Sequence, residues 1–217
     1  TGMNFLNPAL VARAFLFFSY PTHMSGDAVW VSAKHFGDAV TGATPLGEIM
    51  ASNAHSGQEL LQGLSCSALD MFVGVIPGSV GETSTLCILL GAFLLIWTGV
   101  ASWKIMAASI AGALAVGLVG DLTGVSAIPC YMHLVLGGFA FGTVFMATDP
   151  VTSCQTECGK WIYGFIIGAL CVTVRLFNPG YAEGMMLAIL LANTFAPLID
   201  ECVTSRHISK KNRQIPA

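Results

Sequence analysis

Apolar stretches with few charges alternate with polar segments over most of this chain. The first stretch covers residues 8–20, contains one charge, Arg13, and ends at Pro21. Five more follow at 83–102, 104–121, 127–147, 160–177 and 181–200. Because a helix needs roughly 20 mostly apolar residues to cross a bilayer, the pattern predicts five membrane-spanning helices. The stretch at 8–20 would be a sixth, either short or the surviving end of a longer one.

Residues 22–82 follow a different pattern. They hold six acidic residues and one lysine, Lys34, together with several glycines and serines. We expect this segment to lie outside the membrane or at its surface, with helices near 45–54 and 57–73. Residues 76–84 are typical of a Pro/Gly turn that leads into a helix start.

Composition supports a membrane protein. Hydrophobic residues make up 54% of the 217 residues and charged residues only 10%, whereas soluble domains carry about 25% charged residues. The sequence therefore predicts an all-α polytopic membrane protein. With a net charge of −3 and nine basic residues, nucleic-acid binding is not supported. No phosphate-binding loop, dinucleotide fingerprint, zinc spacing or Ser/His/Asp arrangement is present.

Neither the ends of the chain nor its cysteines point to a specific chemistry. The chain begins at Thr1 without an initiator Met or a signal peptide, so we expect it to be the C-terminal part of something longer. Its seven cysteines fit no metal-binding pair, and we expect reduced thiols and no metal site. Small residues at 138 and 142, and at 164 and 168, favour close helix packing, although such glycines can also merely soften a helix.

Basic residues indicate how the helices are oriented. Four of them, Arg206, Lys210, Lys211 and Arg213, follow the last apolar stretch, which predicts a cytoplasmic C-terminus. Counting five crossings back places Lys160 and Lys104 on the same side and residues 22–82 on the outer, periplasmic side.

One motif carries specific chemistry. Residues 38–44 read Asp-Ala-Val-Thr-Gly-Ala-Thr, the acceptor pattern of proteins that carry FMN esterified to the last threonine, here Thr44. Asp38, Thr41, Gly42 and Ala43 complete it, the small residues allowing close approach of a transferase. Alternatively, Thr44 caps a helix that begins at Pro45. Both interpretations can hold together.

The chain resembles the family of B-type subunits of the sodium-translocating NADH:quinone oxidoreductases (NQR) and, less closely, the D-type subunits of RNF complexes. The resemblance follows the family's order over essentially the whole chain. Besides the flavin motif, it is carried by residues 4–10, 12–18, 25–30, 76–82, 101–104, 133–142, 145–153, 159–161, 178–190 and 196–200. Two departures are a slightly longer stretch after Trp30 and Thr41 in place of the usual serine.

The resemblance implies two inverted five-helix repeats, as in urea channels, with this chain supplying the second repeat and the end of the first. Residues 1–21 would end the N-terminal repeat, and 22–82 would be the periplasm-facing segment with the flavin motif. Residues 83–200 would form a five-helix transmembrane bundle, and 201–217 a basic cytoplasmic tail.

The resemblance also implies a redox role in a bacterial inner membrane. Electrons from NADH, bound by another subunit, would reach the covalent FMN on Thr44, then a riboflavin and finally ubiquinone, while sodium leaves the cytoplasm. The chain would act within a six-subunit NADH:ubiquinone reductase (Na+-transporting), a translocase, and not alone. A flavin transferase would attach the FMN. The quinone-proximal residues would lie in an N-terminal part absent from this chain.

Asn4 and Asn7 match the family's amides near the riboflavin. A side-chain amide can donate to and accept from the edge of a flavin, but both residues can instead start or cap the helix near Pro8.

Ionisable residues within the apolar stretches cost roughly 2.5–3.5 kcal/mol each at a helix centre. These residues are Arg13, Asp121, His133, Asp149, Arg175 and Glu183. We expect most of them to lie at the membrane–water interfaces. Glu183 would then face the positive end of the last helix. The alternative places Asp149 and Glu183 along a sodium route. Competing functions are an RNF-type ferredoxin:NAD oxidoreductase subunit, a solute channel or permease, and a flavin-free scaffold.

Overall fold

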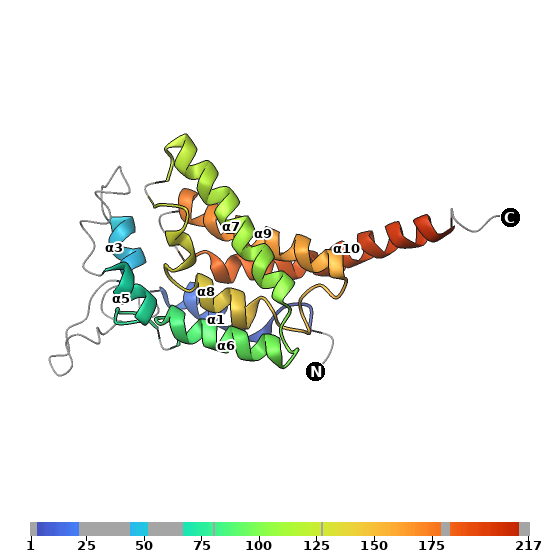
Figure 1. The fold of residues 1–217 in the computed structure, drawn as a ribbon, viewed down its shortest axis with the longest axis horizontal. Helices are drawn as coiled ribbons and strands as arrows, with labels where there is room; N and C mark the ends of the chain where they lie inside the picture. Colours follow the sequence, from blue (N-terminus) through green and yellow to red (C-terminus); the bar gives the residue numbers. More distant parts are fainter. Residues whose placement is uncertain are drawn as a thin grey trace.

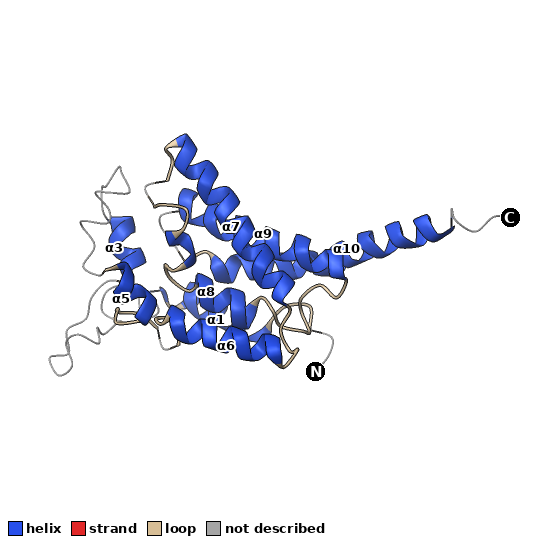
Figure 2. Cartoon of the chain, in the orientation of Figure 1, coloured by secondary structure: helices blue, strands red, loops and turns tan. Residues whose placement is uncertain are grey.

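The computed structural model describes residues 4–21, 44–51, 67–79, 81–126, 128–178 and 183–212. Over these ranges the chain is helical and contains no strand (Figure 2). The elements are α1 (Pro8–Ser19), α3 (Pro45–Ala51), α5 (Ala68–Val73), α6 (Thr85–Trp97), α7 (Trp103–Thr123), η2 (Met132–Leu134), α8 (Phe139–Phe141), η3 (Gly142–Met146), α9 (Glu157–Phe177) and α10 (Met185–Asn212). The predicted all-α class is confirmed.

Within the described ranges, three helices, α7, α9 and α10, are long and apolar enough to cross a membrane. They coincide with the stretches predicted at 104–121, 160–177 and 181–200, so the chain is a multi-pass membrane protein. Helix α10 continues beyond residue 200 to Asn212 and carries Lys210 and Lys211 in its last turn. Figure 1 shows this extension projecting from the bundle on the right.

Residues 127–147 do not form the single spanning helix that the apolar pattern predicts. The chain instead passes through the 3-10 turn η2, the one-turn helix α8 and the π-helical turn η3. Gly137 lies between them with a φ of +61°, a left-handed conformation that interrupts a right-handed helix and that glycine adopts without steric cost. An apolar run alone does not reveal such a break.

Helix α6 is also shorter than predicted. It has 13 residues and begins after Ser84, whose hydroxyl accepts the Cys87 N–H at 3.3 Å. At 1.5 Å per residue it is about 20 Å long, less than the roughly 30 Å of the hydrocarbon core. One broad face of α6 is exposed and apolar, at Leu86, Leu89, Leu90, Phe93, Leu94 and Trp97.

Glycines allow α7 and α9 to pack closely. A Cβ added to Gly164 would lie 2.6 Å from the Ile105 carbonyl oxygen, and one added to Gly168 would overlap the Ser109 carbonyl oxygen. The predicted role of this glycine pair in helix packing is confirmed. Gly138 is the N-cap of α8, and its carbonyl oxygen accepts the Gly142 N–H at 2.8 Å, so this pair also lies one helical turn apart. A Cβ on Gly142 would lie 2.5 Å from Met185 Cγ at the start of α10.

Two short helices, α3 and α5, lie at the end of the bundle opposite the C-terminal extension of α10 (Figure 1). They share one apolar cluster with the segment around η2: Leu46, Ile49, Met71, Ile128, Met132 and Leu136. The helix predicted at 45–54 is confirmed over 45–51, and that at 57–73 over 68–73. Residues 52–66 lie outside the described ranges. Helix α1 confirms the prediction at 8–20.

Candidate functional site

Thr44 stands immediately before α3, as the sequence predicts. Its carbonyl oxygen accepts the Glu48 N–H at 2.9 Å, and its hydroxyl oxygen accepts the Gly47 N–H at 3.2 Å. The helix-capping interpretation of Thr44 is therefore confirmed. The other motif residues, Asp38, Thr41, Gly42 and Ala43, lie outside the described ranges.

A cavity of about 40 Å³ opens beside Thr44. Its walls come from five parts of the chain: the start of α3, α5, the loop before α6, the broken segment (residues 128–147) and Glu183 before α10. The lining residues are Thr44, Pro45, Leu46, Met71, Ile76, Pro77, Gly78, Glu82, Thr83, Val135, Leu136, Gly137 and Glu183. The sequence assigns Thr44 and Glu183 to separate roles, whereas in the fold both residues line one cavity.

Arg175 of α9 holds the broken segment from behind this cavity. Its Nη1 donates to the His133 carbonyl oxygen and its Nη2 to the Leu136 carbonyl oxygen, both at 2.8 Å. Those carbonyls are available because η2 and the following turn do not continue as a regular helix. Arg175 is 2% exposed and His133 fully buried, so neither side chain reaches solvent, as snorkelling to an interface requires.

Glu183 precedes α10 and reaches back to the same segment. Its Oε1 accepts the Gly138 N–H at 2.7 Å. The carboxylate thus accepts a hydrogen bond from the broken segment. The sequence instead suggests that it acts mainly on the start of the last helix. Glu82 approaches the same glycine: a Cβ on Gly138 would lie 2.9 Å from Glu82 Oε2.

A second group of predicted residues meets elsewhere. Asn7 caps α1, its Oδ1 accepting the N–H groups of Ala9 and Leu10 at 3.0 and 3.3 Å. Its Nδ2 donates to Asp149 Oδ2 at 3.3 Å. Asp149 also accepts the Thr152 hydroxyl at 2.9 Å. The capping interpretation of Asn7 is confirmed. Asn4 is exposed.

Asp149 and Glu183, both considered for a sodium route, do not share one site. Asp149 lies in the turn after η3 and is bonded to the start of α1, whereas Glu183 binds Gly138 beside the Thr44 cavity. Each carboxylate already accepts protein hydrogen bonds. The two carboxylates therefore lie at separate places in the fold and do not form one paired sodium site.

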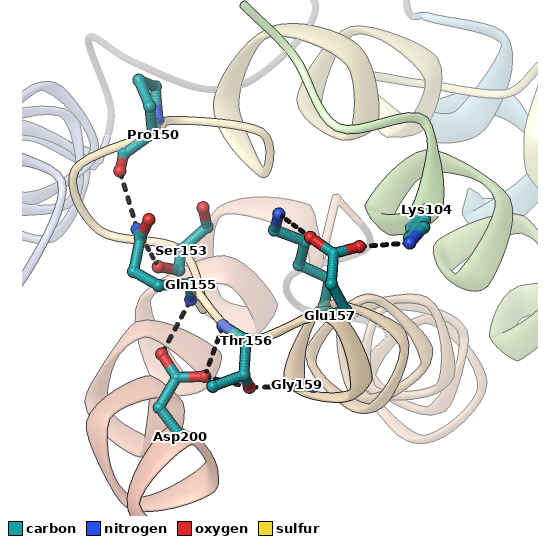
Figure 3. Close-up of polar contacts among 9 residues, drawn as sticks. Lys104, Pro150, Ser153, Gln155, Thr156, Glu157, Gly159 and Asp200 are labelled. Carbon is teal, nitrogen blue, oxygen red and sulfur yellow. Dashed lines mark hydrogen bonds and ion pairs between the residues drawn. The ribbon is translucent and has the colours of Figure 1, made fainter. Parts of the chain in front are cut away.

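Asp200 organises the start of α9, as Figure 3 shows. Its Oδ2 accepts the Gln155 N–H at 2.7 Å, and its Oδ1 accepts the N–H and hydroxyl of Thr156 at 3.0 and 2.5 Å. The Thr156 hydroxyl oxygen in turn accepts the Gly159 N–H at 3.1 Å. A residue of α10 thus positions the N-cap of α9.

Beside this network, Glu157 bridges two lysines (Figure 3). It pairs with Lys104 at the start of α7 and with Lys160 one turn further along α9, the latter at 2.8 Å. The two lysines that the topology argument placed on one side of the membrane therefore lie together. The pairs are solvent-exposed, so we expect them to add little to stability.

Cys154 is buried in the turn between Asp149 and α9. Its Sγ lies 3.4 Å from the Ala196 carbonyl oxygen, to which the thiol donates. Burial, with the nearby Asp200 carboxylate, raises the pKa of Cys154 to about 12. The neighbouring Cys158 is exposed, so the two thiols have opposite accessibility.

Sequence reasoning did not single out Glu82, Arg175 or Asp200 as parts of a site. The indication that the sequence offered for a role of these residues was a charged side chain at or within an apolar stretch. Their partners are backbone N–H and carbonyl groups of distant segments, and those groups become available only through the helix break and the turns of the fold.

Comparison with known proteins gives a consistent result. The profile of the NQR2, RnfD, RnfE family matches residues 1–209. The B-type subunit of the Na(+)-translocating NADH-quinone reductase of Yersinia pestis is 50% identical over 97% of this chain and 51% of its own length. Its counterpart in Klebsiella pneumoniae (strain 342) is 49% identical, over 97% and 52%, and that of Neisseria meningitidis serogroup A is 46% identical, over 97% and 52%.

The chain spans about half the length of these curated relatives. The match runs through the flavin motif, the broken segment and all three long helices. The chain belongs to the NQR2, RnfD, RnfE family.

Proposed function

We propose that this chain carries FMN esterified through its phosphate to Thr44 and relays electrons within a membrane NADH:quinone oxidoreductase that exports sodium. Two lines of support are the motif at 38–44 and the names of the relatives, which are Na(+)-translocating NADH-quinone reductase subunits. The observation that carries the proposal is the position of Thr44 in the wall of a cavity.

The residues present fit such an ester. Esterification replaces the hydroxyl hydrogen of Thr44, whereas the bond from the Gly47 N–H uses a lone pair of the same oxygen. Capping and attachment are therefore compatible. A water needs about 10–15 Å³ on the same measure, so a cavity of about 40 Å³ is too small for the isoalloxazine ring. Its charged lining residues are the carboxylates Glu82 and Glu183, so the phosphate would lie toward the open side of the cavity, away from them.

The bound FMN would supply the electron-transfer chemistry. The chain's contribution is to fix the attachment point. Leu46 anchors α3 in the apolar cluster with η2, and Arg175 holds that segment by two carbonyl groups. Thr44 is thereby tied to the membrane bundle rather than to a separate loop.

The position of Thr44 also supports an orientation. Helix α3 lies at the end of the bundle opposite the extension that carries Lys210 and Lys211 (Figure 1). Since basic residues favour the cytoplasmic side, Thr44 would face the periplasm of a bacterial inner membrane. A flavin transferase acting on that side could reach it.

The remaining assignments are extensions of this proposal. Riboflavin would bind near Asn4 and Asn7, where Asn7 keeps one N–H beyond its bond to Asp149. The other subunits of a six-subunit complex would supply NADH oxidation, and the N-terminal half of the relatives would supply the quinone region.

A sodium route at Asp149 and Glu183 belongs to the same proposal. Its test is sodium-dependent turnover of the complex with Asp149→Asn or Glu183→Gln. Lower sodium affinity in either variant supports the route, whereas unchanged sodium dependence in both removes it.

The central experiment uses the full-length protein co-expressed with a flavin transferase, denatured and separated on a gel under ultraviolet light. We expect a fluorescent band that is lost in Thr44→Ala, with peptide mass placing FMN on Thr44. Thr98→Ala, at the end of α6, is the matched control and should stay fluorescent. A dark wild-type band beside a fluorescent flavinylated standard would contradict the proposal and favour a channel or a scaffold.

A further inference from the structure

A second and larger cavity, of about 310 Å³, opens near the point where α10 leaves the bundle. Its walls are the loop at 99–102, the first turns of α7 and α9, and the turn at 148–155. Asp200 bonds Gln155 in this wall, and the extension of α10 begins at the next residue. A water needs only about 10–15 Å³, so the cavity can hold a group of several polar atoms.

Two lysines give the cavity a positive charge. Lys104 and Lys160 both line it, and the one carboxylate among its lining residues, Glu157, bonds to each of them (Figure 3). Two positive charges and one negative charge leave a net charge of +1. An ammonium group has three N–H donors, so each lysine keeps two donors after its bond to Glu157. Asp149 and Asp200 do not line the cavity.

Neutral donors face the same space. Ser102, the N-cap of α7, makes no capping bond with its side chain, and the first N–H groups of a helix have no partner within it. Ser153 lines the cavity and is 8% exposed. Its carbonyl oxygen accepts the Gln155 side-chain N–H at 3.0 Å, whereas its hydroxyl has no hydrogen-bond partner within the described ranges. A nearly buried hydroxyl without a partner calls for a ligand or a water.

The rim of the cavity has the character of a membrane–water interface. Trp103, in the wall, and Trp161, on the first turn of α9, form an edge-to-face pair with ring centroids 5.7 Å apart. Both rings are exposed, and tryptophans gather at the level of lipid headgroups. Phe165 lies one turn beyond Trp161 on the same face of α9 and is also exposed. Apolar surface therefore adjoins the charged cavity.

We propose that this cavity binds the phosphate group of an anionic phospholipid, with an acyl chain along the apolar surface at Trp161 and Phe165. Basic pockets between spanning helices bind anionic headgroups in this way. A free phosphate would contact none of that apolar surface, which favours a lipid. The basic extension of α10 begins beside the cavity, so the proposed orientation places the lipid in the cytoplasmic leaflet. The binding site does not depend on a flavin at Thr44.

The test incubates the purified full-length protein with mixed micelles of phosphatidylglycerol and phosphatidylcholine. Mass spectrometry then measures the lipid that stays bound as the phosphatidylglycerol concentration is varied. Lys104→Gln, Lys160→Gln and Glu157→Gln are compared with Lys210→Gln, which removes the same charge from the exposed extension of α10. A wash with inorganic phosphate tests for a soluble anion at the same place, and thermal unfolding reports on the folding of each variant.

We expect wild type and Lys210→Gln to retain phosphatidylglycerol in preference to phosphatidylcholine. Lys104→Gln and Lys160→Gln should each lose about fivefold in phosphatidylglycerol affinity, the scale of one basic residue near an anionic surface. Glu157→Gln should bind more tightly, because both lysines are then released. This gain would not follow from a folding defect, since the same ion pairs are broken.

Equal retention of phosphatidylglycerol in all five proteins would overturn the proposal. Displacement of the lipid by inorganic phosphate would overturn the assignment to a phospholipid and indicate a site for a soluble anion.

Discussion

The carboxylate of Asp200 receives both the backbone N–H and the hydroxyl of Thr156, although the two residues belong to different helices. The first N–H groups of a helix have no partner within the helix. Asp200 therefore satisfies donors at the start of α9 from the middle of α10 and locks the two spanning helices together at this end.

Asp200→Asn should destabilise the protein by about 2 kcal/mol, the scale of a hydrogen bond to a charged group. The amide keeps the size of the carboxylate but loses its charge and replaces one acceptor with a donor. The measurement is the thermal unfolding of the purified full-length protein, with Glu201→Gln as the neighbouring exposed control. Equal melting temperatures for the two variants would contradict this role.

Gly168→Ala should destabilise the protein by about 1–3 kcal/mol, the usual cost of overpacking, because the new Cβ would overlap the Ser109 carbonyl oxygen of α7. Backbone atoms cannot move aside as a flexible side chain can. Ala111→Val adds bulk to an exposed position of α7 and should leave stability nearly unchanged. Thermal unfolding compares the two, and a stable Gly168→Ala protein would show that the helices are packed more loosely.

Arg175→Lys should destabilise the protein by about 2 kcal/mol, since an ammonium group cannot reproduce two bonds in a fixed fork. The Leu136 carbonyl oxygen or that of His133 would lose its donor. We also expect weaker flavin attachment, because the wall of the Thr44 cavity would loosen. Arg206→Lys on exposed α10 is the control. Normal melting and normal gel fluorescence in Arg175→Lys would exclude this anchoring role.

Cys154 should resist alkylation in the folded protein at neutral pH, whereas Cys158 should react. The pKa of Cys154 is raised from 9.0 to about 12, and the thiolate is the reactive form. Peptide mass spectrometry after maleimide treatment follows these two thiols separately from the other five cysteines, with Cys158→Ser and Cys154→Ser proteins to assign the labelled peptides. Fast labelling of native Cys154 would show that the turn before α9 opens readily.

The same pKa shift predicts how this thiol affects stability at high pH. Its contribution is fully present below pH 9.0, where both folded and unfolded forms keep the proton. It is lost between pH 9.0 and about 12, because only the unfolded form then releases the proton. Cys154→Ser should therefore show less loss of stability over this interval than wild type, in unfolding experiments at several pH values.

The sequence predicted the long helices well because their signature is local. Apolar stretches of about 20 residues with few charges identify α7, α9 and α10. Thr44 and Asn7 were placed correctly at helix starts for the same reason, since capping depends on a few neighbouring residues.

The broken segment and the partners of the buried charges were not predictable in this way. Residues 127–147 are as apolar as a spanning helix, and only the left-handed backbone at Gly137 shows the interruption. The partners of Arg175 were not predictable, because the carbonyl groups it binds are free acceptors only after that break. Long-range geometry, rather than local pattern, sets its environment.

The short helix α6 has a consequence for the surrounding lipid. At about 20 Å it falls well short of the hydrocarbon thickness, yet its apolar side chains face outward. Acyl chains that meet α6 must compress toward its length, because the polar backbone at Ser84 and Thr98 would otherwise sit in hydrocarbon. Such thinning costs only fractions of a kcal/mol per Å. On the flank of α6 we therefore expect a thinner membrane than beside the longer helices α7, α9 and α10.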